Sequence, residues 1–287
     1  MGVAGVGVSL MVIMNDVVER MGLPYFPLLG SACLIIGLLL TVLVAAMGEL
    51  SKLTCRQSKW VVIRSTCGVM TFVLNLVAVR AGAPMGDVSA LQSISVVVAA
   101  LLGTAALGEP LRALHIGAVV ASFLGAVIVS KPLALLGIEP SPHGQPWLGY
   151  ALALAAGVTA GSTFIAARKA QGISPLVLTA CVGLLEGSAL WVLHLLKVGH
   201  DPSLRLADRP GDVVGIILAL TLTVGVGSGA LSAGAQLCPA AVSSTIYTSV
   251  TMASNFAAQA LLQQEFPDAM SLVGAGMLLL GVALMAV

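Results

Sequence analysis

Long apolar stretches alternate along this 287-residue chain with short clusters of charged residues and prolines. A helix that crosses a bilayer needs about 20 mostly apolar residues. At that length the pattern predicts ten helices. We expect them over residues 1–14, 24–47, 61–80, 86–107, 113–131, 148–167, 174–196, 213–236, 240–262 and 269–287.

The apolar runs are continuous and lack the two-residue alternation of a membrane barrel strand. A backbone in lipid must satisfy its own hydrogen bonds, which helices do within one segment. The fold class predicted is therefore an all-α integral membrane protein. The short apolar start, MGVAGVGVSLMVIMN, has no basic leader of the kind that marks a signal peptide, so we interpret it as the first membrane helix.

Composition supports the membrane interpretation and removes other classes. Charged residues make up 9% of the chain, against about 25% in a typical soluble domain. Thirteen basic residues face twelve acidic ones, so there is no basic excess for nucleic acid. The five cysteines are scattered singly, without a CxxC pair, which argues against a disulfide framework or a zinc site.

An internal repeat divides the chain. PLLGSAC begins at Pro27 and PLVLTAC at Pro175, an offset of 148 residues that also maps Arg20 onto Arg168. Glutamate and proline are rare here, so their matches carry more weight than matches between small apolar residues.

Later in each half the offset grows to 156, which maps Glu109 onto Glu265 and Gly125 onto Gly281. We predict two five-helix repeats, residues 1–131 and 148–287, joined by a Pro- and Gly-rich linker at 132–147. A repeat with an odd number of spans must insert the second time from the opposite side, so the halves are inverted.

The basic residues give a weak test of orientation. With the N-terminus inside, seven lie on the inner side and six outside. The inner seven are Lys52, Arg56, Lys59, Arg64, Arg112, Arg168 and Lys169. Four of them flank one connection, which favours a cytoplasmic N-terminus.

Over nearly its whole length, and most clearly in the second part of each half, the chain resembles the EamA-type carriers of the drug/metabolite transporter superfamily. Residues 78–132 read AVRAGAPMGDVSALQSISVVVAALLGTAALGEPLRALHIGAVVASFLGAVIVSKP. This run has a basic turn, a helix of small and hydroxylated residues, a Gly-Glu loop and a Gly-spaced last helix. The second copy, residues 237–287, is weaker, with Gln264–Glu265 in place of Gly-Glu.

The resemblance implies ten helices with both termini cytoplasmic, and a central cavity enclosed by the first four helices of each half. It also implies a secondary transporter of a small polar metabolite, either amino acid-like or nucleotide-sugar-like, working by exchange or proton coupling. Many relatives carry an arginine close to the positions of Cys33 and Cys181. Its absence here does not favour an anionic substrate.

Glu186 lies at the centre of the seventh predicted helix. A carboxylate at that depth costs about 2.5–3.5 kcal/mol on insertion scales, so it should face a cavity or carry a proton. It is the candidate coupling group, or a counter-charge for a cationic substrate. The structural alternative is a protonated side chain bonded to a neighbouring helix.

Amide, hydroxyl and phenol side chains gather on the third, fourth and ninth predicted helices. As candidate substrate-binding residues we take Asn75, Gln92, Ser93, Ser95, Tyr247, Thr248, Ser249 and Asn255. The alternative is that they hold helices together, at roughly 0.6 kcal/mol per contact. Arg64 and Arg80 stand near the ends of the third helix, where we expect both to snorkel to headgroups.

Two rival functions are an intramembrane enzyme and a non-transporting scaffold or regulator. The enzyme is disfavoured because the chain has no HExxH motif, no GxSG motif and no paired intramembrane aspartates. The scaffold stays open, since fold does not fix function. We expect no cofactor and no metal. The expected partners are the lipid bilayer and a small-molecule substrate, with a homodimer as an open alternative.

Overall fold

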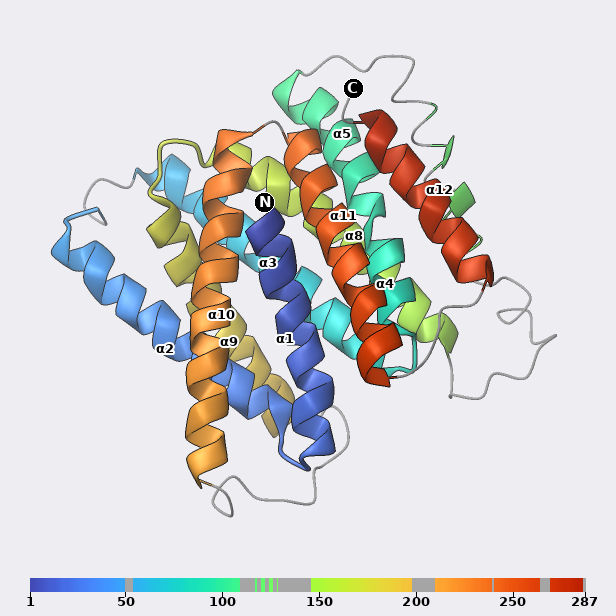
Figure 1. Ribbon diagram of the computed structural model, residues 1–287. Coiled ribbons are helices and arrows are strands. Elements are labelled where there is room, and N and C mark those ends of the chain that lie inside the picture. Colours follow the sequence, from blue (N-terminus) through green and yellow to red (C-terminus); the bar gives the residue numbers. More distant parts are fainter. Residues whose placement is uncertain are drawn as a thin grey trace.

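The computed structural model describes residues 1–49, 54–108, 146–197, 210–238, 240–263 and 269–285, with six scattered positions between 117 and 128. Within these ranges every regular element is a helix (Figure 1). The elements are α1 (Gly2–Arg20), α2 (Tyr25–Ala46), α3 (Cys55–Arg80), α4 (Met85–Gln92), α5 (Ile94–Leu107), α8 (Pro146–Lys169), α9 (Pro175–Leu195), α10 (Pro210–Leu237), α11 (Ala240–Ala258), a π-helical turn (Gln259–Gln263) and α12 (Ala269–Met285).

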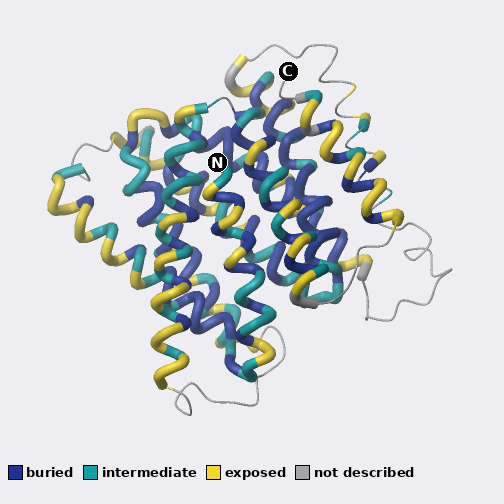
Figure 2. The backbone as a smooth tube through the Cα atoms, in the orientation of Figure 1, coloured by how far each residue is buried: buried dark blue, intermediate teal, exposed yellow. Residues whose placement is uncertain are grey.

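Seven helical segments of the described residues are long and apolar enough to cross a membrane. They match the predicted spans one to four and six to eight. The predicted fifth helix, most of the linker, and Glu109 and Glu265 lie outside the described residues, apart from scattered positions. Figure 2 shows that exposed residues follow the outer helices, and the large exposed apolar side chains include Leu39 and Val42 on α2 and Leu218 and Leu222 on α10.

The first helix is longer than its predicted span, 1–14. It continues to Arg20, and polar residues in its last turns have hydrogen-bond or ion-pair partners. Asp16 pairs with Arg20 one turn later at 3.0 Å, and buried Asn15 accepts a hydrogen bond from Arg80 at 3.3 Å. A polar residue with a partner does not end a helix.

The fourth predicted helix is broken rather than continuous. Ser93 separates α4 from α5, and both its N–H (3.0 Å) and its hydroxyl (2.6 Å) donate to the Ala90 carbonyl. A serine hydroxyl that competes for backbone carbonyls disturbs the helical ladder. The ninth predicted helix also changes form, ending in the π-helical turn at Gln259–Gln263.

Helices from the two predicted halves pack against each other throughout the bundle. α1 packs on α10 and α11, α8 packs on α3, α4 and α5, and α2 packs on α9. The α2–α9 contact is made backbone to backbone at glycines: a Cβ added at Gly187 would lie 2.8 Å from the Gly30 carbonyl oxygen, and one at Gly183 would lie 2.9 Å from that of Cys33. Small residues allow such close approach in lipid.

A buried charged pair in a central cavity

A cavity whose interior space is about 60 Å³ lies between α1, α3, α8, α9, α10 and α11. Most of its lining is apolar or aromatic, including Met11, Phe72 and Phe164. Its polar lining consists of Arg64, Thr71, Asn75, Thr163, Glu186, Ser228 and Tyr247. An apolar cavity with a few convergent polar groups is the usual form of a small-molecule site.

Arg64 is almost completely buried, with 1% of its surface exposed. Its Nη2 donates to Ser232 Oγ at 3.0 Å, and the Ser232 hydroxyl donates to the Ser228 carbonyl at 2.8 Å. Thr179 Oγ1 lies 3.1 Å from the same serine oxygen. The guanidinium is therefore held at one end by α9 and α10, while its buried Nε–H has no hydrogen-bond partner among the described residues.

Glu186 lines the same cavity from α9 and is 5% exposed. Its neighbour Gly187 packs closely against the backbone of α2, and this contact fixes the position of the Glu186 carboxylate relative to α2. Among the described residues no carboxylate lies within 4.0 Å of the Arg64 guanidinium, and no side chain donates a hydrogen bond to Glu186. The two opposite charges thus share the cavity without forming a direct pair.

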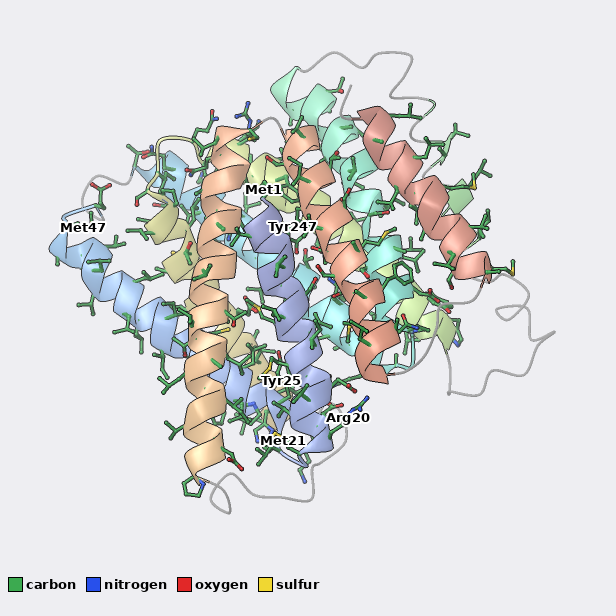
Figure 3. All side chains as sticks on the ribbon, in the orientation of Figure 1. Met1, Arg20, Met21, Tyr25, Met47 and Tyr247 are labelled. Atoms are coloured by element: carbon green, nitrogen blue, oxygen red, sulfur yellow. The ribbon has the colours of Figure 1, made fainter. Side chains whose placement is uncertain are left out.

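Two of the predicted binding residues, Asn75 and Tyr247, line the cavity. Within the part of the chain that the structure describes, the buried Asn75 Oδ1 has no hydrogen-bond partner. Tyr247 comes from α11, next to the first turns of α1 (Figure 3), and its ring meets Phe164 edge-on at 5.8 Å between centroids. The side chains of Gln92 and Thr251 adjoin the Tyr247 hydroxyl.

The other predicted binding residues do not line the cavity. The hydroxyls of Ser93 and Thr248 donate to carbonyls of their own helices, at 2.6 Å each. Ser95 and Ser244 share a hydrogen bond of 3.3 Å that joins α5 to α11. The remaining three are placed as follows: Gln92 is buried beside Tyr247, Ser249 is half-buried, and Asn255 is buried, with no partner for its Oδ1 in the described ranges.

Both arginines predicted to snorkel are instead bound inside the bundle. Arg64 is buried because α3 begins at Cys55, six residues before the predicted start, which places Arg64 about 14 Å along the helix at about 1.5 Å per residue. The sequence carried the signal in Thr54 and Gln57, which form a capping box. Removing Arg64 from the loop charges leaves six basic residues on each side in the orientation test.

Arg80 belongs to a cluster at one end of the bundle, which we call the Arg80 cluster (Asn15, Glu19, Phe26 and Arg80). The guanidinium contacts Glu19 Oε1 at 2.5 Å and lies 3.9 Å above the centre of the Phe26 ring. These contacts join the ends of α1 and α3 to the start of α2. They replace the headgroup contacts expected of a snorkelling side chain.

At the repeat offset of 156, Arg80 maps onto Gln236, which forms a second cluster at the opposite end of the bundle. Its Nε2 donates to the carbonyls of Ala170 (3.2 Å) and Ile173 (3.0 Å), and its own carbonyl accepts from Gln171 at 2.9 Å and Arg168 at 3.3 Å. Figure 3 shows Arg20, beside the first cluster, far from Met1, which packs on Gly234 near the second.

Comparison with known proteins shows which family this chain belongs to. The model of the EamA-like transporter family matches the chain twice, over residues 3–131 and 147–287. The chain belongs to the EamA-like transporter family. Membership in this family of membrane transporters, with the apolar helices, makes it a multi-pass integral membrane protein.

A solved structure shares the fold of this EamA-family chain. It is titled only "Crystal structure of protein", and it matches with a TM-score of 0.66 and 17% sequence identity over 98% of this chain and 95% of its own. No curated protein matched the sequence. The family match and the shared fold support a membrane transporter of the drug/metabolite type.

Proposed function

We propose that this protein is a secondary transporter that carries a small polar metabolite across its membrane by alternating access. The observation that carries the proposal is the pair of buried charges, Arg64 and Glu186, facing one cavity among membrane-crossing helices. Ionisable residues inside a membrane domain are costly and mark solute or proton pathways. A purely structural bundle has no need of either charge.

The proposed architecture is ten membrane helices in two inverted halves, residues 1–131 and 148–287, with a linker between. The double family match supports the two halves. So does the packing: under the repeat α1 corresponds to α8 and α3 to α10, and the contacts α1–α10 and α8–α3 exchange under that correspondence. Inverted repeats around a midplane site are typical of alternating-access carriers.

Glu186 is the proposed coupling group. It can bind a proton or a cationic group from the cavity, since no described side chain occupies it. Asn75 and Tyr247 are the predicted binding residues best placed to contact the solute. Gln92, Ser93, Ser95, Thr248, Ser249 and Asn255 are better explained as support for the helices, with Gln92 positioning Tyr247.

The experiment is solute uptake by the purified protein reconstituted in liposomes. Amino acids, nucleotide sugars and polyamines are tested with and without a proton gradient, and with each solute preloaded to detect exchange. We expect one class to be transported. Failure of every solute under every gradient would favour the scaffold function instead.

Glu186→Gln tests coupling in the same liposomes. It keeps the shape of the side chain and removes the charge, so we expect it to abolish the pH dependence of transport while leaving the amount of folded protein unchanged. Ser188→Ala is the matched control, because Ser188 lies on the same helix and its hydroxyl only bonds the Leu184 carbonyl. Unaltered pH dependence in Glu186→Gln would remove Glu186 from the coupling role.

A further inference from the structure

We propose that the cavity selects a small zwitterion, with Arg64 binding its anionic group and Glu186 its cationic group. The inference rests on the proposed transport function and names the chemical class of solute. It comes from two buried charges of opposite sign that are not paired with each other.

Arg64 is the anion-binding residue because part of its guanidinium is already fixed and part is free. The bond from Nη2 to Ser232 orients the group, and no described residue accepts a hydrogen bond from the buried Nε–H. Arginine stays charged in proteins and binds carboxylate and phosphate oxygens with directed hydrogen bonds. A buried donor without an acceptor is costly, so a bound anionic group that draws the guanidinium toward itself would offset that cost.

Glu186 sets the second requirement. A solute that is only anionic would place its negative charge beside that of Glu186 in one cavity of low polarity. A solute that is only cationic would place its positive charge beside that of Arg64. Unpaired buried charges are strongly disfavoured. A molecule with one group of each sign satisfies both side chains at once, and its ammonium can also meet the unpaired Asn75 oxygen.

The test uses matched sets of solutes that differ only in charge. For each of glycine, serine and leucine, uptake into liposomes is compared among four competitors: the amino acid, its amide, its N-acetyl derivative and its aminophosphonate. We expect the zwitterion to compete at least about tenfold better than the amide or the N-acetyl compound, the size of one charge-assisted hydrogen bond. The aminophosphonate distinguishes a site for carboxylates from one that also accepts phosphonates.

Variants assign the two charges. Arg64→Gln is expected to remove the preference for the zwitterion over the amide, and Glu186→Gln the preference over the N-acetyl compound. Arg64→Lys keeps the charge and is expected to retain part of the first preference. Arg20→Gln is the control, because Arg20 is exposed and pairs only locally with Asp16.

Two results would overturn the inference while leaving transport intact: equal competition by singly charged analogues, or transport of a nucleotide sugar or a polyamine in place of zwitterions. An equal loss for all four competitors in Arg64→Gln would also overturn it, because that is the effect of a purely structural arginine. Absence of any solute movement in the wild type would overturn the proposed function itself.

Discussion

The glycine contact between α2 and α9 yields a sharp stability prediction. A Cβ added at Gly187 would lie 2.7 Å from Leu34 Cγ, 2.8 Å from the Gly30 carbonyl oxygen and 2.9 Å from the Leu34 nitrogen. Two of these atoms are backbone, so no side-chain rotation can relieve the contact. The helices must separate by several tenths of an ångström in Gly187→Ala.

The magnitude follows from two opposing effects. Alanine gains up to about 1 kcal/mol over glycine in helix propensity. Overpacking of a close contact costs about 1–3 kcal/mol. We expect a net destabilisation of about 1 kcal/mol, together with a shift of Glu186, since the two residues are neighbours on α9.

Gly229→Ala is the matched control. Gly229 also lies inside a membrane helix, and an added Cβ there meets no atom within 4 Å. The assay is thermal unfolding of the purified proteins, followed by the fraction that remains monodisperse in detergent. We expect Gly187→Ala to melt a few degrees below the wild type, at roughly 2–4 °C per kcal/mol, and Gly229→Ala to match or exceed it. Equal melting temperatures for both variants would refute the close-contact argument.

Three further predictions address the site, the end cluster and the orientation. Tyr247→Phe keeps the packing with Phe164 but leaves the neighbouring Gln92 side chain without the hydroxyl, so unfolding should be easier by about 1–3 kcal/mol and uptake by the folded variant should fall several-fold; wild-type uptake would show that the hydroxyl does not face the solute. A double-mutant cycle on unfolding with Arg80→Gln and Glu19→Gln should give a coupling below about 1 kcal/mol, because Glu19 is half exposed; a much larger value would contradict this solvent screening. With single-cysteine variants in oriented vesicles, exposed Cys55 should react with an impermeant maleimide from the cytoplasmic face only; reaction from the other face would invert the proposed orientation.

The pattern of apolar runs predicted the membrane class and the positions of most helices, because lipid imposes a length and a composition on every span. The ends of the helices were predicted less well from the sequence. The first helix was predicted to end at residue 14, yet Asp16 and Arg20 pair with each other within it. The break at Ser93 occurs where the serine hydroxyl bonds a backbone carbonyl of the preceding turn and not a side chain on another helix. Hydropathy does not distinguish these two arrangements.

The candidate site was predicted in part. Glu186 stood out because a carboxylate is rare in the centre of an apolar run. Arg64 did not, because its depth depends on where α3 begins, and nearby basic residues made it resemble a loop charge. Among the hydroxyl residues, the sequence could not separate those facing a cavity from those bonding their own helix, since both occur at the same spacings.

Arg64 and Glu186 together carry no net charge, and this has an electrical consequence. Moving one elementary charge through 100 mV requires about 2.3 kcal/mol. A neutral empty cavity and a neutral zwitterion in it can both change sides without that work. Exchange of one zwitterion for another would then run at the same rate in polarised and depolarised vesicles, and any dependence of transport on the membrane potential would report the movement of coupling ions.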